Sequence, residues 1–206
     1  MENSGITRRG QKALETREKI LTAAEQLFQQ QGFKQVSVDA IVKKAGVAKG
    51  SFYVHFSSKN TLITSHIAAL VHDADKSYGT YLETFPQDTP TAKQILSLSG
   101  KIADILSDRI GHERMEIVYE TLLTKEVNVD SVIGYDRELY NIFNGLIERG
   151  VERGEFKTNK PAATIARHCV LSMRGLTYEW CIRYPDFNLK EAFLTHFEML
   201  LDGITV

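Results

Sequence analysis

The chain lacks the features that would place it in a membrane or direct it out of the cell. None of its apolar runs approaches the ~18 consecutive residues that a membrane-spanning helix needs. The N-terminal residues 1–15 have no apolar core of the kind found in secretory signals. Proline occurs only four times in 206 residues, which leaves room for long helices. We therefore expect a cytoplasmic protein with no membrane partner.

Cysteine is almost absent, and the two that occur fall in one predicted helix. Cys169 and Cys181 are twelve positions apart, which corresponds to ~18 Å along a continuous helix. Disulfide-bonded residues have Cα atoms within ~7 Å of each other. A continuous helix therefore excludes an intrachain disulfide, and we expect two reduced thiols packed in a core.

The sequence also lacks the short motifs of common enzymes. It contains no nucleophile elbow, no glycine loop for phosphates, no HExxH and no Cys/His set at metal-binding spacing. We accordingly predict no metal, no cofactor and no enzymatic activity. A helical enzyme whose catalytic residues are dispersed along the chain stays open as an alternative.

Charge is distributed unevenly along the chain. Residues 1–62 carry ten Lys and Arg against five Asp and Glu, a net charge of +5. Because the whole chain has a net charge of −1, the remaining residues carry −6. A basic N-terminal part on an acidic body suggests a polyanionic partner that binds only the first part.

The pattern of residues 16–54 predicts three short helices. Thr16–Gln31 has apolar residues at the spacing of an amphipathic helix, and Gly32 can end it. Ser37 is a good N-cap for a second helix over 38–44. The turn 45–47 contains Gly46, which tolerates a positive φ, and a third helix follows over 48–54. This arrangement is a helix-turn-helix.

The third helix exposes side chains suited to a DNA groove. Val47 and Phe52 are the expected inward anchors, which leaves Lys49, Gly50 and Tyr53 on the outer surface together with Ser51. Glycine inside a helix costs ~1 kcal/mol relative to alanine, so close approach of DNA to the backbone is one reason to keep it. An ordinary solvated helix is the alternative at this point.

The residues of this region resemble the DNA-binding signature of TetR/AcrR-family transcriptional regulators. The resemblance covers residues 16–63 nearly without gaps. It is carried by Phe33, Val36-Ser37-Val38, Ile41, Ala45-Gly46-Val47, Lys49-Gly50, Phe52-Tyr53, His55-Phe56, Ser58-Lys59 and Leu62. It implies an all-α homodimer of about nine helices, with a helix-turn-helix domain followed by a helical ligand-binding and dimerisation domain.

The resemblance also assigns DNA contacts to individual residues. Ser37 and Lys59 match positions that contact phosphate, and Lys49, Gly50 and Ser51 match positions that face bases. Tyr53 and His55 match positions at the end of the recognition helix, near the DNA backbone. The full set is Ser37, Lys49, Gly50, Ser51, Tyr53, His55 and Lys59. Val42 and Asn60 depart from the usual Ala and Glu without threatening the fold.

We place the domain boundary between residues 58 and 59. Residues 1–58 form the DNA-binding domain, in which residues 1–14 are a basic arm expected to be disordered without DNA. This arm either reaches an adjacent minor groove or is a solvated tail. Residues 59–206 form the effector-binding and dimerisation domain.

The expected body is entirely helical. A long helix over 59–83 starts beside the recognition helix, and further helices are expected from 91 to 107, through Glu116 to Leu123, and from 130 or 131 to 153. Of the last two helices, the first is expected to end at about Arg183 and the second to begin at Leu189. The final helix carries two apolar rows, one with Phe193 and Phe197. Pairing of the last two helices with those of a second copy is expected; burial of both rows within one chain is the alternative.

Polar residues among apolar ones are candidates to line an effector pocket. They are His66, Tyr119, Tyr135, His168, Arg174 and Trp180, with Tyr78 as a further candidate. Arg174 is the sharpest, because a charge among apolar neighbours needs a partner. That partner is either Glu116 or Glu120 of the same chain, or an anionic group of a ligand.

The predicted function is that of a ligand-responsive transcriptional regulator. We expect a homodimeric repressor that binds a palindromic double-stranded DNA operator and is released by a small-molecule inducer. A DNA-binding or interaction protein that responds to no ligand is the alternative.

Overall fold

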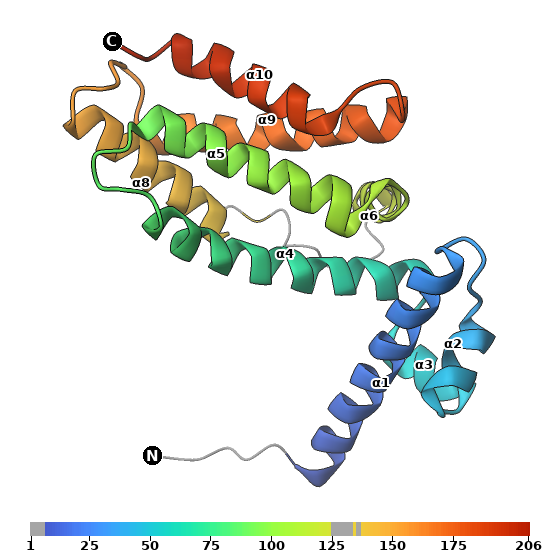
Figure 1. The fold of residues 1–206 in the computed structure, drawn as a ribbon. Coiled ribbons are helices and arrows are strands. Elements are labelled where there is room, and N and C mark those ends of the chain that lie inside the picture. The colour runs from blue at the N-terminus through green and yellow to red at the C-terminus, as the bar shows by residue number, and fades with distance from the viewer. Residues whose placement is uncertain (1–6, 125–133, 135–136) are drawn as a thin grey trace. The chain divides into compact units, whose positions relative to one another are not determined.

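The computed structural model of the protein describes residues 7–124, 134 and 137–206. In this part of the chain nine α-helices and one π-helix are present, which confirms the all-α prediction (Figure 1). They are α1 (Arg8–Gln31), α2 (Val38–Ala45), α3 (Lys49–His55), α4 (Lys59–Glu83), α5 (Thr91–Asp104), η1 (Ile105–Ile110), α6 (His112–Thr124), α8 (Glu138–Glu152), α9 (Ala162–Arg183) and α10 (Leu189–Asp202). None of these helices combines the length and apolar character that a bilayer crossing requires.

The chain divides into two compact units, Met1–His66 and Ile67–Val206. The division falls within α4, later than the boundary between residues 58 and 59 proposed from the sequence. The first residues of α4 belong to the first unit because they contact it. His66 Nε2, for example, lies 3.0 Å from Glu25 Oε2 of α1.

Helix α1 begins earlier than the sequence suggested. Arg8 is already helical, so the prediction of a disordered arm was wrong for residues 8–14, and residues 1–6 lie outside the described part. Thr7 is the N-cap, and its Oγ1 accepts a hydrogen bond from the amide of Gly10 at 3.2 Å. Gly10 therefore lies in the first turn, where it does not interrupt the helix.

The helix-turn-helix prediction is confirmed. Ser37 caps α2, with Oγ accepting from the amide of Ala40 at 3.1 Å. Gly46 ends α2 in the left-handed conformation, at φ 66° and ψ 35°, as the turn requires. Helix α3 follows directly, with Ala48 as its N-cap.

The core of the first unit is aromatic and aliphatic. The four residues of the predicted stripe on α1 are all buried, namely Ile20, Ala24, Leu27 and Phe28. From α3 and its C-cap, Phe52 and Phe56 are 0% and 2% exposed, with ring centroids 5.8 Å apart. Burial of these rings fixes which face of α3 is left for solvent.

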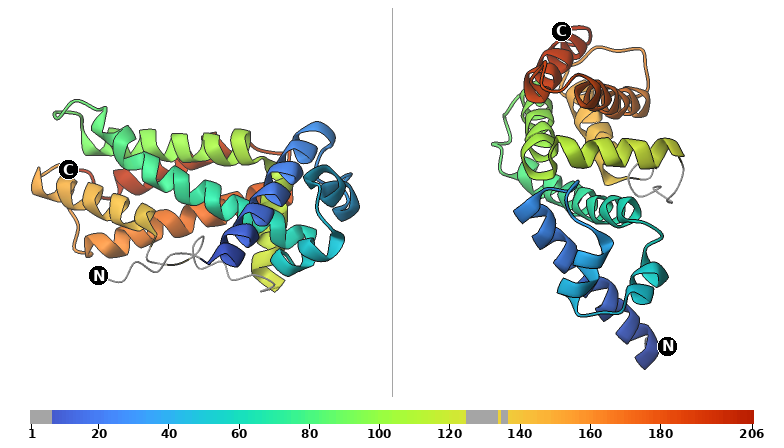
Figure 2. Two further views of the ribbon diagram at one scale, coloured as in Figure 1. Left: turned by 90° about the horizontal axis from the view of Figure 1, so that it is seen from below. Right: turned by 90° about the vertical axis from the view of Figure 1, so that its right-hand side faces the viewer.

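In the second unit, α8 packs against α9, and α10 packs against both α5 and α9 (Figures 1 and 2). Phe193 and Phe197 of α10 are fully buried, and Phe197 stacks on Phe143 of α8 at 5.8 Å. One apolar row of the last helix therefore belongs largely to the core of its own chain. Leu194 and Leu200 stay partly exposed.

Two helices of the second unit differ from expectation. The helix expected to reach residue 107 ends at Asp104, and the chain continues as the π-helix η1 up to Gly111, which has φ 86°. The helix expected from residue 130 or 131 begins at Glu138, because Arg137 has the extended ψ of 139°. Residues 130–133 lie outside the described part.

The two cysteines behave as the sequence predicted. Cys169 and Cys181 are free and buried on the continuous helix α9. Burial raises the pKa of each thiol to about 12. Both sulfurs are therefore protonated at neutral pH and poorly nucleophilic.

The two glycines of α8 provide a paired test of this packing. An alanine Cβ at Gly150 would overlap the ring of Phe156, which is 3% exposed, whereas Gly145 faces open space. We expect Gly150→Ala to lower the free energy of unfolding by about 1–3 kcal/mol. Gly145→Ala should raise it by up to about 1 kcal/mol. Urea denaturation measures both, and equal effects from the two substitutions would contradict the packing described.

Candidate functional site

Helix α3 presents a small polar surface to solvent. Lys49, Gly50 and Tyr53 are exposed, with Tyr53 at 52%, while Phe52 between them is fully buried. Ser51 is half-buried beside them. Lys49, Gly50 and Tyr53 thus share the solvent-facing side of α3.

Lys49 is paired in the DNA-free protein. Its Nζ lies 2.8 Å from Oδ1 of Asp39 in the first turn of α2, and both side chains are more than half exposed. The hydrogen bond donated to Asp39 raises the pKa of Lys49 above its ordinary value. Because exposed ion pairs contribute little to stability, Lys49 can exchange Asp39 for a DNA group at little cost.

Ser37 and His55 flank this helix pair. Ser37 is exposed at the start of α2, so a phosphate near its hydroxyl would also meet the amides of the first turn. His55 is half-buried in the last turn of α3, next to Phe56 at 6.4 Å between ring centroids. Contact of these two residues with DNA stays a prediction.

Lys59 has partners other than those expected from the resemblance. Its Nζ donates hydrogen bonds of 2.9 Å to the carbonyl oxygens of both Phe33 and Val36. The same nitrogen lies 4.1 Å from the centre of the Phe33 ring. Burial lowers the pKa of Lys59 below its ordinary value. Two of its three N–H groups are therefore engaged within the first unit, and the side chain is half-exposed.

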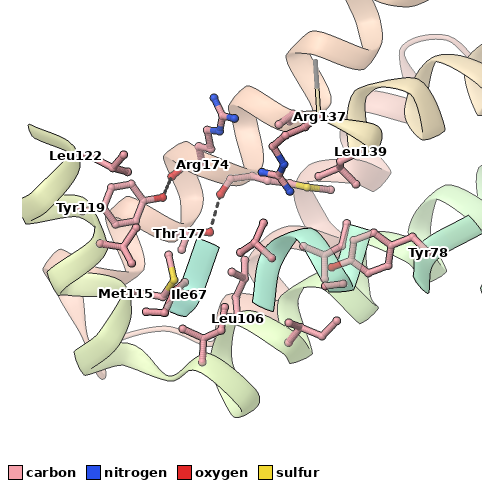
Figure 3. A pocket seen from close by; sticks show the side chains of 18 residues that line it. Ile67, Tyr78, Leu106, Met115, Tyr119, Leu122, Arg137, Leu139, Arg174 and Thr177 are labelled. Atoms are coloured by element: carbon pink, nitrogen blue, oxygen red, sulfur yellow. Dashed lines mark hydrogen bonds between the residues drawn. The ribbon is translucent and has the colours of Figure 1, made fainter. Parts of the chain in front are cut away.

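The second unit encloses a cavity of about 100 Å³. Figure 3 shows side chains converging on it from several helices. Thirteen of its eighteen lining residues are aliphatic or methionine: Ile67, Val71 and Ala74 of α4, Ile102 of α5, Ile105, Leu106 and Ile110 of η1, Met115, Val118 and Leu122 of α6, Leu139 of α8, and Val170 and Met173 of α9. Two tyrosines, two arginines and one threonine complete the wall.

The polar groups of this wall are mostly bound to the protein itself. Tyr119 donates its hydroxyl proton to the carbonyl of Arg174 at 2.8 Å, and Thr177 donates to the carbonyl of Met173 at 2.7 Å (Figure 3). Burial raises the pKa of the Tyr119 phenol above its ordinary value, as it does for Tyr78. Both phenols are therefore neutral at physiological pH.

Arg137 of the cavity wall forms an ion pair with Asp75. Arg137 donates from Nε to Oδ2 of Asp75 at 2.9 Å and from Nη2 to Oδ1 at 2.8 Å. The two side chains are 12% and 4% exposed. Since Asp75 lies on α4 and Arg137 is the N-cap of α8, the pair joins these two helices.

Arg137 is not among the residues predicted from the sequence. A signal was present, because an arginine directly before an apolar helical run needs a buried partner if its helix start packs inward. This signal was not recognised because the helix was predicted to start at residue 130 or 131, which made Arg137 an ordinary position on a helix surface.

Two of the residues predicted to contact an effector do line the cavity. They are Tyr119 and Arg174, and Tyr78 joins them. The guanidinium carbon of the half-buried Arg174 lies 5.8 Å from the centre of the Tyr140 ring, and Glu116 and Glu120 are exposed. In Figure 3 the Arg174 guanidinium points away from the other labelled side chains, whereas that of Arg137 lies among them.

The structure places three other candidates away from the lining. His66 belongs to the first unit and faces Glu25, because α4 turns that side of the helix toward α1. Trp180 is 5% exposed and packs edge-on against His112 and Tyr184. His168 is exposed on α9. Tyr135 lies outside the described residues.

Comparison with known proteins places the chain among regulators. Residues 20–65 match the family described as "Bacterial regulatory proteins, tetR family". The HTH-type transcriptional repressor BepR of Brucella suis biovar 1 (strain 1330) is 28% identical over 185 residues, which cover 86% of each chain. The probable HTH-type transcriptional regulator YttP of Bacillus subtilis (strain 168) is 30% identical over 151 residues, 69% of this chain and 68% of that protein.

The fold has solved counterparts as well. The structure of FadR from Thermus thermophilus, a TetR-family transcriptional repressor in complex with lauroyl-CoA, superimposes with a TM-score of 0.69. It is 19% identical and covers 92% of this chain and 95% of that one. These relatives are transcriptional regulators rather than enzymes. With the helix-turn-helix of the first unit and the helical second unit, the chain belongs to the TetR family of DNA-binding transcriptional regulators.

Proposed function

We propose that the protein is a homodimeric repressor that leaves a palindromic operator when a small apolar molecule enters its cavity. The first unit would bind DNA, and the second would bind the effector and the partner chain. The observation that carries the proposal is the exposed polar side of α3. It is held rigidly because Phe52 on the opposite side of the helix is fully buried.

The proposed DNA contacts divide into two kinds. Lys49, Gly50 and Ser51 would lie against base edges, where lysine can donate to guanine N7 and O6. The phosphate contacts would come from three residues around them, namely Ser37, Tyr53 and His55. Phosphate contacts fix the orientation of the protein and base contacts select the sequence, so both kinds are needed.

Exposed apolar residues on the last two helices support the proposed dimer. Leu171, Tyr178 and Ile182 of α9 are 40%, 43% and 60% exposed, and the exposed Gly175 lies between them. Their spacing places them on one face of the helix. On α10, Met199 is 70% exposed. Two chains joined here could read half-sites about one DNA turn, ~34–36 Å, apart.

The cavity supports an apolar effector. A ligand would meet mainly aliphatic side chains, and the hydroxyls of Tyr119 and Thr177 already donate to main-chain carbonyls. Ligand pockets usually measure ~300–1,000 Å³, so a cavity of about 100 Å³ must widen or admit only a slender molecule. The lauroyl-CoA bound by Thermus thermophilus FadR carries such a slender chain.

Helix α4 is the proposed link between effector and DNA. Its residues Ile67, Val71 and Ala74 line the cavity, and its first residue is Lys59. A ligand that displaces these side chains would move one continuous helix whose first turns belong to the DNA-binding unit. A shift of a packed helix is an established kind of allosteric transition.

We predict that the double substitution Lys49→Ala/Tyr53→Ala abolishes operator binding. Each of the two side chains should contribute roughly 1–3 kcal/mol to binding, and the dimer presents each of them twice, so affinity should fall at least about 100-fold. Fluorescence anisotropy measures the affinity, and sedimentation checks that the dimer persists. Lys93→Ala, which removes an exposed lysine from α5, is the control. Binding that survives the double substitution would show that α3 is not the recognition helix.

Gly50→Ala should separate stability from DNA binding. An alanine Cβ at this position meets no atom within 4 Å in the DNA-free protein. The substitution should therefore raise the free energy of unfolding, by up to about 1 kcal/mol. Operator affinity should fall about tenfold or more because the methyl group would occupy space needed by DNA.

Gly79→Ala is the matched control for Gly50→Ala. It adds a methyl group in equally open space, but on α4 in the second unit. It should stabilise the protein without changing operator affinity. If Gly50→Ala left the affinity unchanged as well, DNA would not approach the backbone at α3.

Filling the cavity should make the protein unresponsive. With 1-decanol as an apolar probe, we expect the melting temperature of the natural chain to rise and its operator binding to weaken. Ala74→Leu should remove both effects, since Ala74 is 4% exposed and lines the cavity. Ala69→Leu, on the exposed side of the same helix, should retain them. An equal response in both variants, or none in the natural chain, would contradict an apolar effector site here.

A further inference from the structure

Lys59 is placed for a different role from the one implied by the resemblance. It is the first residue of α4, and its side chain reaches back to the segment between α1 and α2. The carbonyl oxygens of Phe33 and Val36 each accept a hydrogen bond of 2.9 Å from Nζ. The Phe33 ring lies 4.1 Å from the same nitrogen. An ammonium group has three N–H donors, and two of them are committed to these carbonyls.

The segment that Lys59 holds leads directly into α2. Phe33 and Val36 are 7% and 2% exposed, so their side chains anchor it to the core. Main-chain hydrogen bonding within it consists of a turn in which the Val36 amide donates to the Phe33 carbonyl at 3.3 Å. Ser37, the N-cap of α2, follows immediately. Lys59 therefore fixes the point from which α2 starts.

The position of α2 in turn affects the recognition helix. Asp39 in the first turn of α2 holds Lys49 of α3 at 2.8 Å, and the tight turn at Gly46 joins the two helices. A displaced start of α2 would move both the phosphate-contacting serine and the partner of the base-facing lysine. Contacts to DNA depend on register, so a small displacement weakens several of them together.

We infer that Lys59 is a positioning residue for DNA recognition, holding the segment before α2 in place, and that its ammonium does not neutralise a DNA phosphate. The inference rests on the proposed docking of α3 on DNA. Partial burial of the ammonium, which lowers the pKa of Lys59, agrees with it. The exposed Lys49, by contrast, is open to DNA.

The salt dependence of binding distinguishes the two roles. Each phosphate neutralised by a lysine contributes about −0.9 to the slope of log K against log salt concentration, so removing such a lysine from both chains changes the slope by about 1.8. We expect Lys59→Met to weaken operator binding about tenfold at every salt concentration without changing the slope. Lys49→Gln, the comparison variant, should reduce the slope. The inference would be overturned if Lys59→Met reduced the slope as Lys49→Gln does. It would also be overturned if Lys59→Met left the affinity unchanged.

Hydrogen exchange in the DNA-free protein provides a readout that a phosphate contact would not affect. Amides of residues 33–40 should exchange faster in Lys59→Met than in the natural chain, and Lys49→Gln should leave them unchanged. If Lys59→Met does not fold, Lys59→Gln, which keeps one N–H donor group, takes its place with the same expectations. Unchanged exchange in the Lys59 variant would contradict the positioning role. Failure of the natural chain to bind DNA would instead overturn the proposed function, while the exchange result would still report on Lys59.

Discussion

The proposed recognition surface depends on the burial of two phenylalanine rings. Helix α3 has seven residues, fewer than the ~12–15 at which isolated helices become even marginally stable in water. Its position must therefore come from packing, and Phe52 and Phe56 supply it with exposures of 0% and 2%. Arg17 of α1 covers Phe56, with its guanidinium carbon 5.2 Å from the ring centre. Because these rings face the core, Lys49 and Tyr53 face solvent, and the proposed DNA-binding surface follows from the hydrophobic core.

In the second unit, side-chain packing likewise determines the shape of the cavity. Its wall is mostly aliphatic, while the Asp75–Arg137 ion pair fixes α4 relative to the start of α8. Breaking a buried pair by removing one partner costs about 3–5 kcal/mol, so the pair restricts which arrangements the cavity can adopt. An ion pair of fixed geometry, combined with a wall of aliphatic side chains that can shift, suits a sensor that must change shape without unfolding.

The parts of this structure that could be predicted from the sequence are those set by local chemistry. Ser37 as a cap and Gly46 as a left-handed turn follow from residue type and spacing alone. The cavity could not be predicted in the same way, because its wall is assembled from six helical segments. His66 and Arg174 show why: each lies on a predicted helix, but its direction depends on long-range packing, with His66 turned to Glu25 and Arg174 to Tyr140. Arg137 was not predicted because the start of α8 was placed before it in the chain.

The central claim is that two copies of the basic first unit dock on duplex DNA and read it with α3. Its most direct test is selection of bound fragments from a pool of random double-stranded DNA by the purified protein, with the stoichiometry of the selected complexes determined. The account predicts enrichment of one palindromic sequence, bound by two chains, with half-sites about one helical turn apart and an affinity that falls steeply with salt. Enrichment of no sequence, or binding that does not respond to salt, would contradict it.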